Sequence, residues 1–127
     1  MIGCGGLGSP ASYYLSGAGV GTLGLVDADV VEESNLHRQI IHTEARVNIN
    51  KTESAKTSIN AFNRHTNVIT YPHKFTNETA EEIVNSQKWD VVMDGSDNPK
   101  TRYLVNDICM IKKLPLVSGS ALKWEGQ

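Results

Sequence analysis

The sequence predicts an α/β fold of the Rossmann-like, doubly wound type, in which helices cover both faces of a mainly parallel sheet. Short β-branched apolar runs alternate with longer segments of helical period, which is typical of parallel strands joined by crossover helices. A glycine-rich turn opens the first helical segment, and an acidic residue closes the next apolar run. Because 127 residues suffice for one domain of ordinary size, we expect a single, partial nucleotide-binding domain over residues 1–127.

The first half of the chain contains two strands and two helices in this interpretation. Residues 1–3 are a remnant of the first strand, most of which is missing, and a helix follows from about residue 7 to 18. We expect a strand over residues 22–27, and then a loop that continues through Arg38. The next helix covers about residues 50–62. Its predicted inner face consists of Ala55, Ile59 and Phe62.

The second half repeats the alternation. We expect strands at residues 68–71, 89–94 and 114–118, the second of them buried on both faces and the third the last in the chain. Asn77 is the predicted cap of one helix, with Glu78 in its first turn and with Ala80, Ile83 and Val84 facing inward. Asn98-Pro99 is a typical N-cap followed by a proline at the first helical position. The helix that follows places Val105, Ile108, Cys109 and Lys112 on or beside one stripe.

Composition excludes several classes of partner. Charged residues make up 20% of the chain and the net charge is -2, so we expect no nucleic acid and no anionic membrane surface as partner. The longest uncharged stretch, residues 2–26, holds eight of the eleven glycines and is therefore a poor membrane span.

Two distant cysteines, Cys4 and Cys109, form neither a disulfide framework nor a CxxC pair. We therefore expect a reducing, cytoplasmic location.

The segment Gly3-Cys4-Gly5-Gly6-Leu7-Gly8 matches G-x-G-x-x-G, and Asp27 follows about 20 residues later. Glycines allow the backbone to approach a phosphate, the helix start offers free N–H donors, and the acidic side chain can bind ribose hydroxyls. The pattern predicts a nucleotide site. It does not separate ATP from NAD, so an NAD-dependent oxidoreductase remains an alternative at this point.

Cations and a carboxylate follow at positions suited to a polyphosphate. Arg38 lies in a polar segment after the ribose strand, and Lys51 lies at a helix start, where its charge opposes the helix dipole unless an anion binds. A solvated surface lysine is the alternative for Lys51. Asp97 lies at the carboxyl end of a strand and is suited to Mg²⁺, because Asn98 can cap the following helix alone.

Taken together, these motifs resemble the ThiF/MoeB superfamily of ubiquitin-activating-enzyme-like adenylyltransferases. The resemblance spans the whole chain and includes the glycine loop, Asp27-Ala28-Asp29, Ser34 to Arg38, Lys51, Asp97-Asn98 and the closing residues 116–127. Residues 101–107 and the Glu-Gly-Gln ending are most similar to the eukaryotic branch that serves molybdenum cofactor synthesis and tRNA thiolation.

The resemblance implies an enzyme that uses ATP and Mg²⁺ to adenylate the C-terminal glycine of a ubiquitin-fold sulfur-carrier protein. It implies catalytic roles for Arg38, Lys51 and Asp97, with Asp97 as the magnesium ligand. The implied nucleotide-binding residues are Gly6, Asp27, Ser34, Asn35, Leu36, His37, Arg38, Lys51, Asp97 and Asn98. Of the four histidines, only His37 is expected beside the site.

The chain departs from the superfamily pattern at both ends, so we expect a truncated piece of a longer protein. Relatives carry a full first strand, and they carry zinc ligands beyond the region matched here, so zinc is expected only in full-length relatives. A homodimer is expected for the full-length form. The alternative within the same family is a non-catalytic module that binds nucleotide or dimerises.

Overall fold

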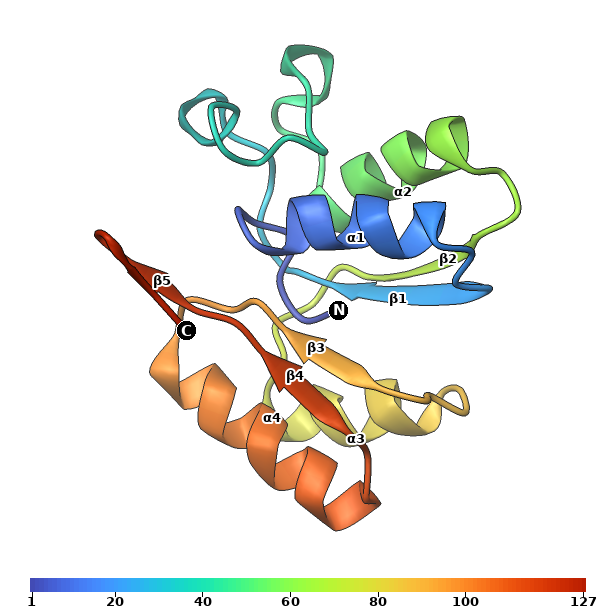
Figure 1. Ribbon diagram of the computed structural model, residues 1–127, viewed down its shortest axis with the longest axis vertical. Helices are drawn as coiled ribbons and strands as arrows, with labels where there is room; N and C mark the ends of the chain where they lie inside the picture. The colour runs from blue at the N-terminus through green and yellow to red at the C-terminus, as the bar shows by residue number, and fades with distance from the viewer.

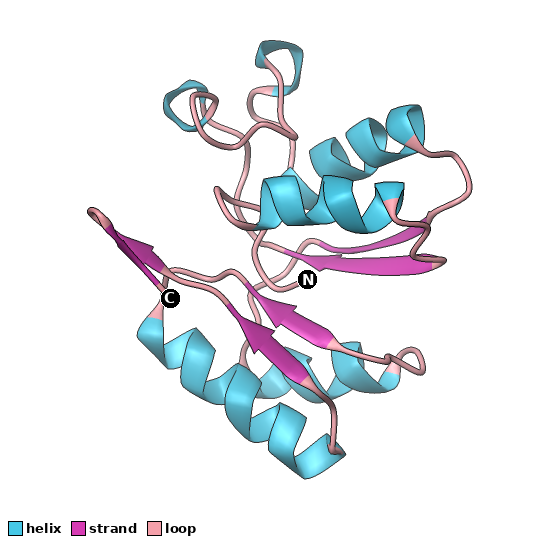
Figure 2. Ribbon diagram, in the orientation of Figure 1, coloured by secondary structure: helices cyan, strands magenta, loops and turns pink.

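The computed structural model describes residues 1–127 and confirms the Rossmann-like α/β fold class (Figure 2). The helices are α1 Gly8–Gly17, α2 Lys51–Phe62, α3 Asn77–Asn85 and α4 Pro99–Lys112, with short 3₁₀ turns at Glu33–Asn35 and Glu44–Arg46. The strands are β1 Thr22–Val26, β2 Asn67–Tyr71, β3 Val92–Asp94, β4 Leu116–Ser118, β5 Ala121–Leu122 and β6 Glu125–Gly126.

The central sheet is parallel and consists of two strand pairs joined by the first residues of the chain. β1 pairs with β2, and β3 pairs with β4. Between the pairs, Ile2 forms parallel bridges to Val26 on one side and to Asp94 on the other. The resulting order is β2, β1, residues 1–3, β3, β4, which is the order of a doubly wound sheet whose direction of growth reverses at its first strand.

Helices cover both faces of this sheet, as Figure 1 shows, with α1 and α2 on one side and α3 and α4 on the other. Each side has its own apolar core. The core toward α1 and α2 contains Cys4, Leu23, Leu25, Ile41, Ala55, Ile59 and Val68. The core toward α3 and α4 contains Ile2, Val26, Phe75, Ala80, Ile83, Val84, Val92, Val105 and Cys109. The alternating side chains of β1 thus contribute to both layers.

Two of the predicted helix starts have different outcomes. Asn98 caps α4 as expected, because its side chain accepts a hydrogen bond from the N–H of Lys100 at 2.9 Å. Asn77, by contrast, is the first helical residue of α3, and the cap is Thr76, which forms a reciprocal capping box with Thr79. The prediction for Asn77 was wrong because a threonine pair spaced by three residues satisfies two free N–H groups at once.

The remaining differences concern the ends of elements. β3 begins at Val92, so the expected strand from Trp89 is shorter, and Val91 is 45% exposed. Phe62 is 60% exposed and contacts Tyr13 edge to face instead of joining the inner face of α2. β4 is not the last strand, because β5 and β6 form an antiparallel hairpin beyond it.

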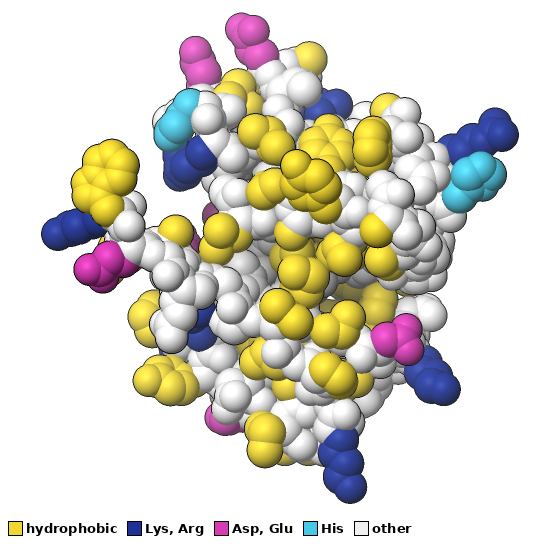
Figure 3. Space-filling model, viewed as in Figure 1, with side chains coloured by type: hydrophobic (Ala, Val, Ile, Leu, Met, Phe, Trp, Pro, Cys, Tyr) yellow, Lys and Arg dark blue, Asp and Glu magenta, His cyan; other side chains and the backbone are white.

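Apolar side chains also lie on the surface. On the face drawn in Figure 3 these side chains gather over the middle of the molecule, and one more apolar side chain lies on the projecting β5–β6 hairpin. The largest exposed ones include Tyr14, Tyr103, Met110, Ile111, Leu122 and Trp124. None of the helices has both the length and the apolar character needed to span a bilayer.

Candidate functional site

The predicted site residues lie where the parallel strands end. The glycine loop begins at Gly3, the end of the central segment, Asp27 follows β1, and residues 95–98 follow β3 on the other side of the same central segment. This edge contains the point at which the strand order reverses, where loops diverge and open α/β sheets bind ligands. The fold therefore places these three segments beside one another, as the sequence predicts.

The glycine loop, Gly3–Gly8, is shaped by close backbone contacts. Gly3 has φ of +89°, and a Cβ on Gly8 would lie 2.0 Å from the carbonyl oxygen of Gly3. No side chain other than hydrogen fits at Gly8 without movement of the backbone. The N–H groups of Gly5, Gly6 and Leu7 have no acceptor within the chain, so the loop presents unpaired donors at the start of α1.

Asp27 is held against this loop. Its Oδ2 accepts a hydrogen bond from the N–H of Cys4 at 2.8 Å, and its Oδ1 accepts one from the N–H of Asp29 at 2.9 Å. A carboxylate oxygen can accept more than one hydrogen bond, so Asp27 retains capacity for ribose hydroxyls. The contact fixes the spacing between the predicted ribose and phosphate positions.

The polar segment 34–39 covers the outer side of the glycine loop. The aliphatic stem of Arg38 lies over Gly6, since a Cβ on Gly6 would be 3.8 Å from Cγ and Cδ of Arg38. The guanidinium is exposed and contacts only the carbonyl of Ser34 and the ring of His37, both at 3.3 Å. Arg38 therefore has a free cationic group directly above the loop. Asn35 and Leu36 are half-buried in the same segment.

Lys51 is buried, in contrast to the solvated alternative. Its side chain is 9% exposed, and its Nζ lies 3.4 Å from Oδ2 of Asp29, which is 70% exposed. Because water screens an exposed carboxylate, this ion pair offsets little of the cost of burying the ammonium. A second anion at this position would complete the compensation.

The loop after β3 holds two aspartates in different states. Asp94 is buried and its Oδ1 accepts hydrogen bonds from both the N–H and the hydroxyl of Ser96, at 2.9 and 2.7 Å. Asp97 is exposed and has no hydrogen bond or ion pair within the chain. Its carboxylate is thus free to bind a cation, while Asn98 is engaged as the cap of α4.

The residues present fit a magnesium ion bound together with phosphates. Mg²⁺ is usually held by one or two carboxylates plus phosphate oxygens, and Asp97 supplies one unengaged carboxylate. The chain contains no cluster of three or more acidic, histidine or cysteine side chains suited to a metal. Asp97 would therefore share the ion with a ligand rather than hold it alone.

Three contacting residues were not assigned to the site from the sequence. Asp29 pairs with Lys51, and Arg102 donates hydrogen bonds to the carbonyls of Ser96 and Gly119, which ties the Asp97 loop to the end of β4. His42 contacts the carbonyl of Cys4, so His37 is not the only histidine beside the site. No local pattern marks the His42 contact, because its partners are 38 and 12 residues away in sequence.

Burial also decides the state of the cysteine in the loop. Burial of Cys4, together with the nearby charge of Asp27, raises the pKa of its thiol to about 12. A neutral, buried thiol is a poor nucleophile, since the thiolate is the reactive form. Cys4 therefore packs in the core beneath the loop and takes no chemical role.

Comparison with known proteins gives matches over the full length of the chain. The ThiF family matches residues 1–127. An adenylyltransferase and sulfurtransferase MOCS3 from Dictyostelium discoideum is 58% identical over all 127 residues, which cover 29% of that relative. An adenylyltransferase and sulfurtransferase UBA4 from Debaryomyces hansenii is 51% identical, with 28% of its length covered. The chain thus spans less than a third of the curated relatives it matches.

Solved structures with a similar fold include complexes with ATP. The crystal structure of Escherichia coli MccB with ATP superposes with a TM-score of 0.87 at 29% identity, over 96% of this chain and 37% of that one. The ATP complex of the E. coli tRNA N6-threonylcarbamoyladenosine dehydratase TcdA gives 0.87 at 27% identity, over 96% and 51%. With its glycine loop, strand order and full-length match, the chain belongs to the ThiF family.

Proposed function

We propose that this chain binds Mg-ATP at the glycine loop and forms the adenylating part of an enzyme that activates a ubiquitin-like sulfur-carrier protein. The observation that carries the proposal is the buried ammonium of Lys51, whose only partner within the chain is the exposed carboxylate of Asp29. The relatives named as adenylyltransferases and the ATP complexes of similar folds support the same proposal.

The nucleotide follows from the arrangement of donors and charges. Asp27 would accept the ribose hydroxyls, the N–H groups of residues 5–7 would bind phosphate oxygens, and Arg38 and Lys51 would flank the triphosphate. An enzyme that transfers a hydride has to position a nicotinamide and needs fewer cations around the phosphates. The charges therefore favour ATP over NAD.

The cations would reduce the electrostatic repulsion between the two anions that react. A carboxylate must approach the innermost phosphate of ATP, and two unit charges 4 Å apart repel by about 4 kcal/mol at an effective dielectric near 20. Arg38 and Lys51 would offset this repulsion and stabilise charge on the phosphates as pyrophosphate leaves. Magnesium, when bound at Asp97, would neutralise further phosphate charge and orient the leaving group.

The acceptor would be the C-terminal glycine carboxylate of the carrier. A carboxylate is already a nucleophile, so no general base is needed to activate it. The product would be an acyl adenylate, formed as the carboxylate oxygen bonds to the innermost phosphorus and the bond to pyrophosphate breaks. A homodimer and a cytoplasmic location belong to the same proposal.

Exchange of labelled pyrophosphate into ATP tests the proposed function. The expected result is exchange that depends on a carrier with a free C-terminal Gly-Gly and is lost when both glycines are removed. Calorimetric titrations with Mg-ATP and NAD separate nucleotide choice from turnover. Binding of Mg-ATP without exchange would favour the non-catalytic alternative, and preference for NAD would contradict the proposal.

Single substitutions then test the residues. Loss of one cation from Lys51→Ala or Arg38→Ala is expected to slow exchange by about 10² to 10³ fold, by analogy with removal of an oxyanion donor. Asp97→Asn is expected to weaken the response to magnesium. Lys56→Ala, Arg64→Ala and Asp90→Asn are controls that change the same charges elsewhere. If all three test variants behave like their controls, the site assignment is wrong.

A further inference from the structure

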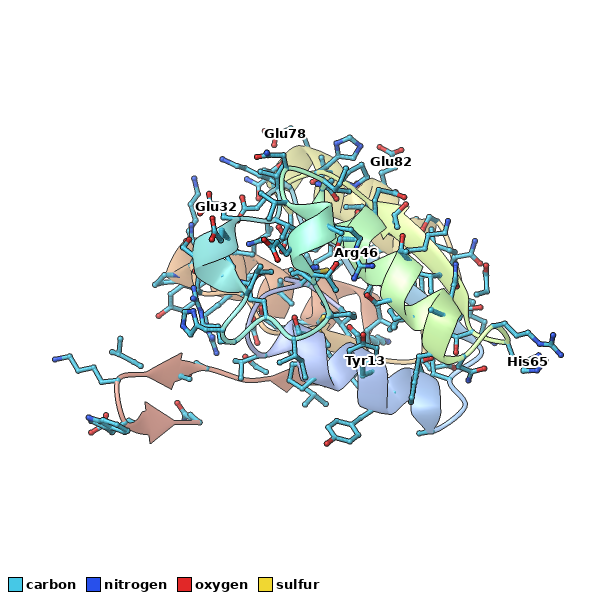
Figure 4. The ribbon with its side chains drawn as sticks, turned by 90° about the horizontal axis from the view of Figure 1, so that it is seen from above. Tyr13, Glu32, Arg46, His65, Glu78 and Glu82 are labelled. Carbon is cyan, nitrogen blue, oxygen red and sulfur yellow. The ribbon has the colours of Figure 1, made fainter.

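His42 connects the glycine loop to α2 through a chain of buried hydrogen bonds. Its Nε2 lies 3.0 Å from the carbonyl oxygen of Cys4, and its Nδ1 lies 2.9 Å from Oγ of Ser54. Ser54 in turn accepts a hydrogen bond from Nε of Arg46 at 2.9 Å. Figure 4 shows Arg46 over α2, at a distance from the exposed His65, which lies in the turn after the C-terminal end of that helix. His42 itself is 5% exposed.

The partners of His42 determine where its proton lies. A backbone carbonyl can only accept, so Nε2 must carry the hydrogen that it shares with Cys4. Arg46 is always a donor, and it donates to the oxygen of Ser54. The hydroxyl hydrogen of Ser54 is then free to point at Nδ1. A neutral imidazole with the proton on Nε2 therefore gives a hydrogen-bond partner to the Cys4 carbonyl, to the Ser54 hydroxyl and to Nδ1.

Two hydrogen bonds hold Cys4, one on each side of the residue. Its N–H donates to Asp27, and its carbonyl accepts from His42. The orientation of the next peptide groups, whose N–H donors face the predicted phosphates, depends on these two contacts. Because Ser54 lies one helical turn after Lys51, the network also ties the loop to the helix that carries the buried ammonium.

We propose that His42 is a positioning residue for nucleotide binding, acting as a neutral Nε2–H donor that fixes the glycine loop against α2. This inference rests on the proposed nucleotide site and goes beyond it, since His42 would touch no part of the ligand. Its contribution is to hold the loop donors in place before the phosphates arrive, which lowers the ordering cost of binding.

The charges around His42 favour the neutral form. Its pKa is lowered, mainly because burial disfavours the imidazolium, and the positive charges of Lys51 and Arg46 act in the same direction. The hydrogen bond to the Cys4 carbonyl and the charge of Asp27 act in the opposite direction. Protonation would also leave the Ser54 hydroxyl without its acceptor. His42 should therefore gain a proton only at a pH below its ordinary pKa, and nucleotide affinity should fall at that pH.

The tautomer is measured directly by two-bond ¹H–¹⁵N NMR correlation on the histidine-labelled chain, without any ligand. We expect the Nε2–H tautomer for His42 at pH 7.5. An Nδ1–H tautomer or an imidazolium at that pH would overturn the proposal. This readout does not depend on nucleotide binding, so it separates failure of the tautomer assignment from failure of the proposed function.

Calorimetric titration with Mg-ATP measures the positioning role. His42→Leu removes the donor and should weaken binding about tenfold, the factor that corresponds to loss of one buried hydrogen bond. His42→Gln places an amide N–H near the same carbonyl and should bind within about threefold of the parent. His42→Gln should also lose the fall in affinity that the parent shows on acidification, whereas the control His65→Gln should retain it.

If His42→Leu does not fold, Ser54→Ala serves in its place, because it removes the donor to Nδ1. We expect Ser54→Ala to keep the Nε2–H tautomer, because the Cys4 carbonyl still needs a donor, and to bind Mg-ATP more weakly, because His42 loses its contact with α2. Binding equal to that of His65→Gln in either His42→Leu or Ser54→Ala would overturn the positioning role. A parent chain that binds no Mg-ATP would contradict the proposed function and this role together, and the NMR spectrum would still decide the tautomer.

Discussion

Gly8 marks the tightest backbone contact in the glycine loop. A methyl group at this position would lie 2.0 Å from the carbonyl oxygen of Gly3, well inside contact distance, and the loop would have to open to accept it. We expect Gly8→Ala to lower the free energy of unfolding by about 1 to 3 kcal/mol, the usual cost of overpacking, and to weaken Mg-ATP binding. Thermal unfolding and calorimetry measure the two effects.

Gly21→Ala is the matched control for this change. A Cβ on Gly21 would have no atom within 4 Å, so the same methyl group should be tolerated there. Equal stability of the Gly8→Ala and Gly21→Ala variants would show that the loop is not held as closely as the structure indicates.

For single residues, local motifs predicted where a side chain lies along the fold better than they predicted which residues it contacts. The glycine loop and Asp27 could be paired from sequence because G-x-G-x-x-G and a following acidic residue have a known spacing, and the structure joins them through Cys4. The burial of Lys51 could not be predicted, since it depends on packing of α2 against the loop. The His42 contact with Cys4 could not be predicted for the same reason.

Asn50 is the N-cap of α2 and fixes where this helix begins. Its Oδ1 accepts from the N–H of Thr52 at 2.9 Å, and its Nδ2 donates to the carbonyls of Asp27 and Asp29, both at 3.1 Å. Asn50→Ala should therefore cost about 1 to 2 kcal/mol of stability as a lost cap. It should also weaken Mg-ATP binding, because the cap aligns Lys51 with the end of β1.

Thr76→Ala is the control for the element, because Thr76 caps α3 on the opposite face of the sheet. We expect a similar loss of stability without a change in nucleotide affinity. If Thr76→Ala weakens Mg-ATP binding as much as Asn50→Ala does, the effect of Asn50 is a general loss of stability and not alignment of Lys51.

At the element scale, the helices were predicted well because their caps are local signals, as Asn98-Pro99 shows. Errors arose where two local signals compete, as at Thr76 and Asn77. The β5–β6 hairpin was missed because its two-residue strands carry no periodic pattern. Strand lengths depend on pairing partners distant in sequence, which explains why β3 is shorter than its apolar run.

The stability of the whole molecule should decline toward both acidic and alkaline pH. Burial lowers the pKa of the His42 imidazole from 6.5. The unfolded chain then binds more protons than the folded one, so stability falls as the pH decreases through about 6.5. The Cys4 thiol has its pKa raised from 9.0 to about 12, so stability falls as the pH rises above about 9.

Urea unfolding across pH 5 to 11 measures this profile. Cys4→Ala should remove much of the alkaline decline and leave the acidic decline in place. A profile in which Cys4→Ala and the parent decline equally above pH 9 would show that the thiol is not buried in the folded chain.

At the scale of the molecule, the fold class was predicted correctly from the alternation of strands and helices, because that alternation permits few arrangements. The reversal of strand order at residues 1–3 then places the glycine loop beside the Asp97 loop. The exact approach of Arg38 to Gly6 could not be predicted, since the intervening loop has no regular structure from which to extrapolate.

A crystal structure of the chain with bound Mg-ATP would locate the nucleotide. We expect the triphosphate across the N–H groups of residues 5–7, with Arg38 and Lys51 in contact with phosphate oxygens and Asp97 bound to the magnesium ion. A triphosphate bound at another edge of the sheet, or one at this edge with Lys51 still paired only to Asp29, would contradict this expectation.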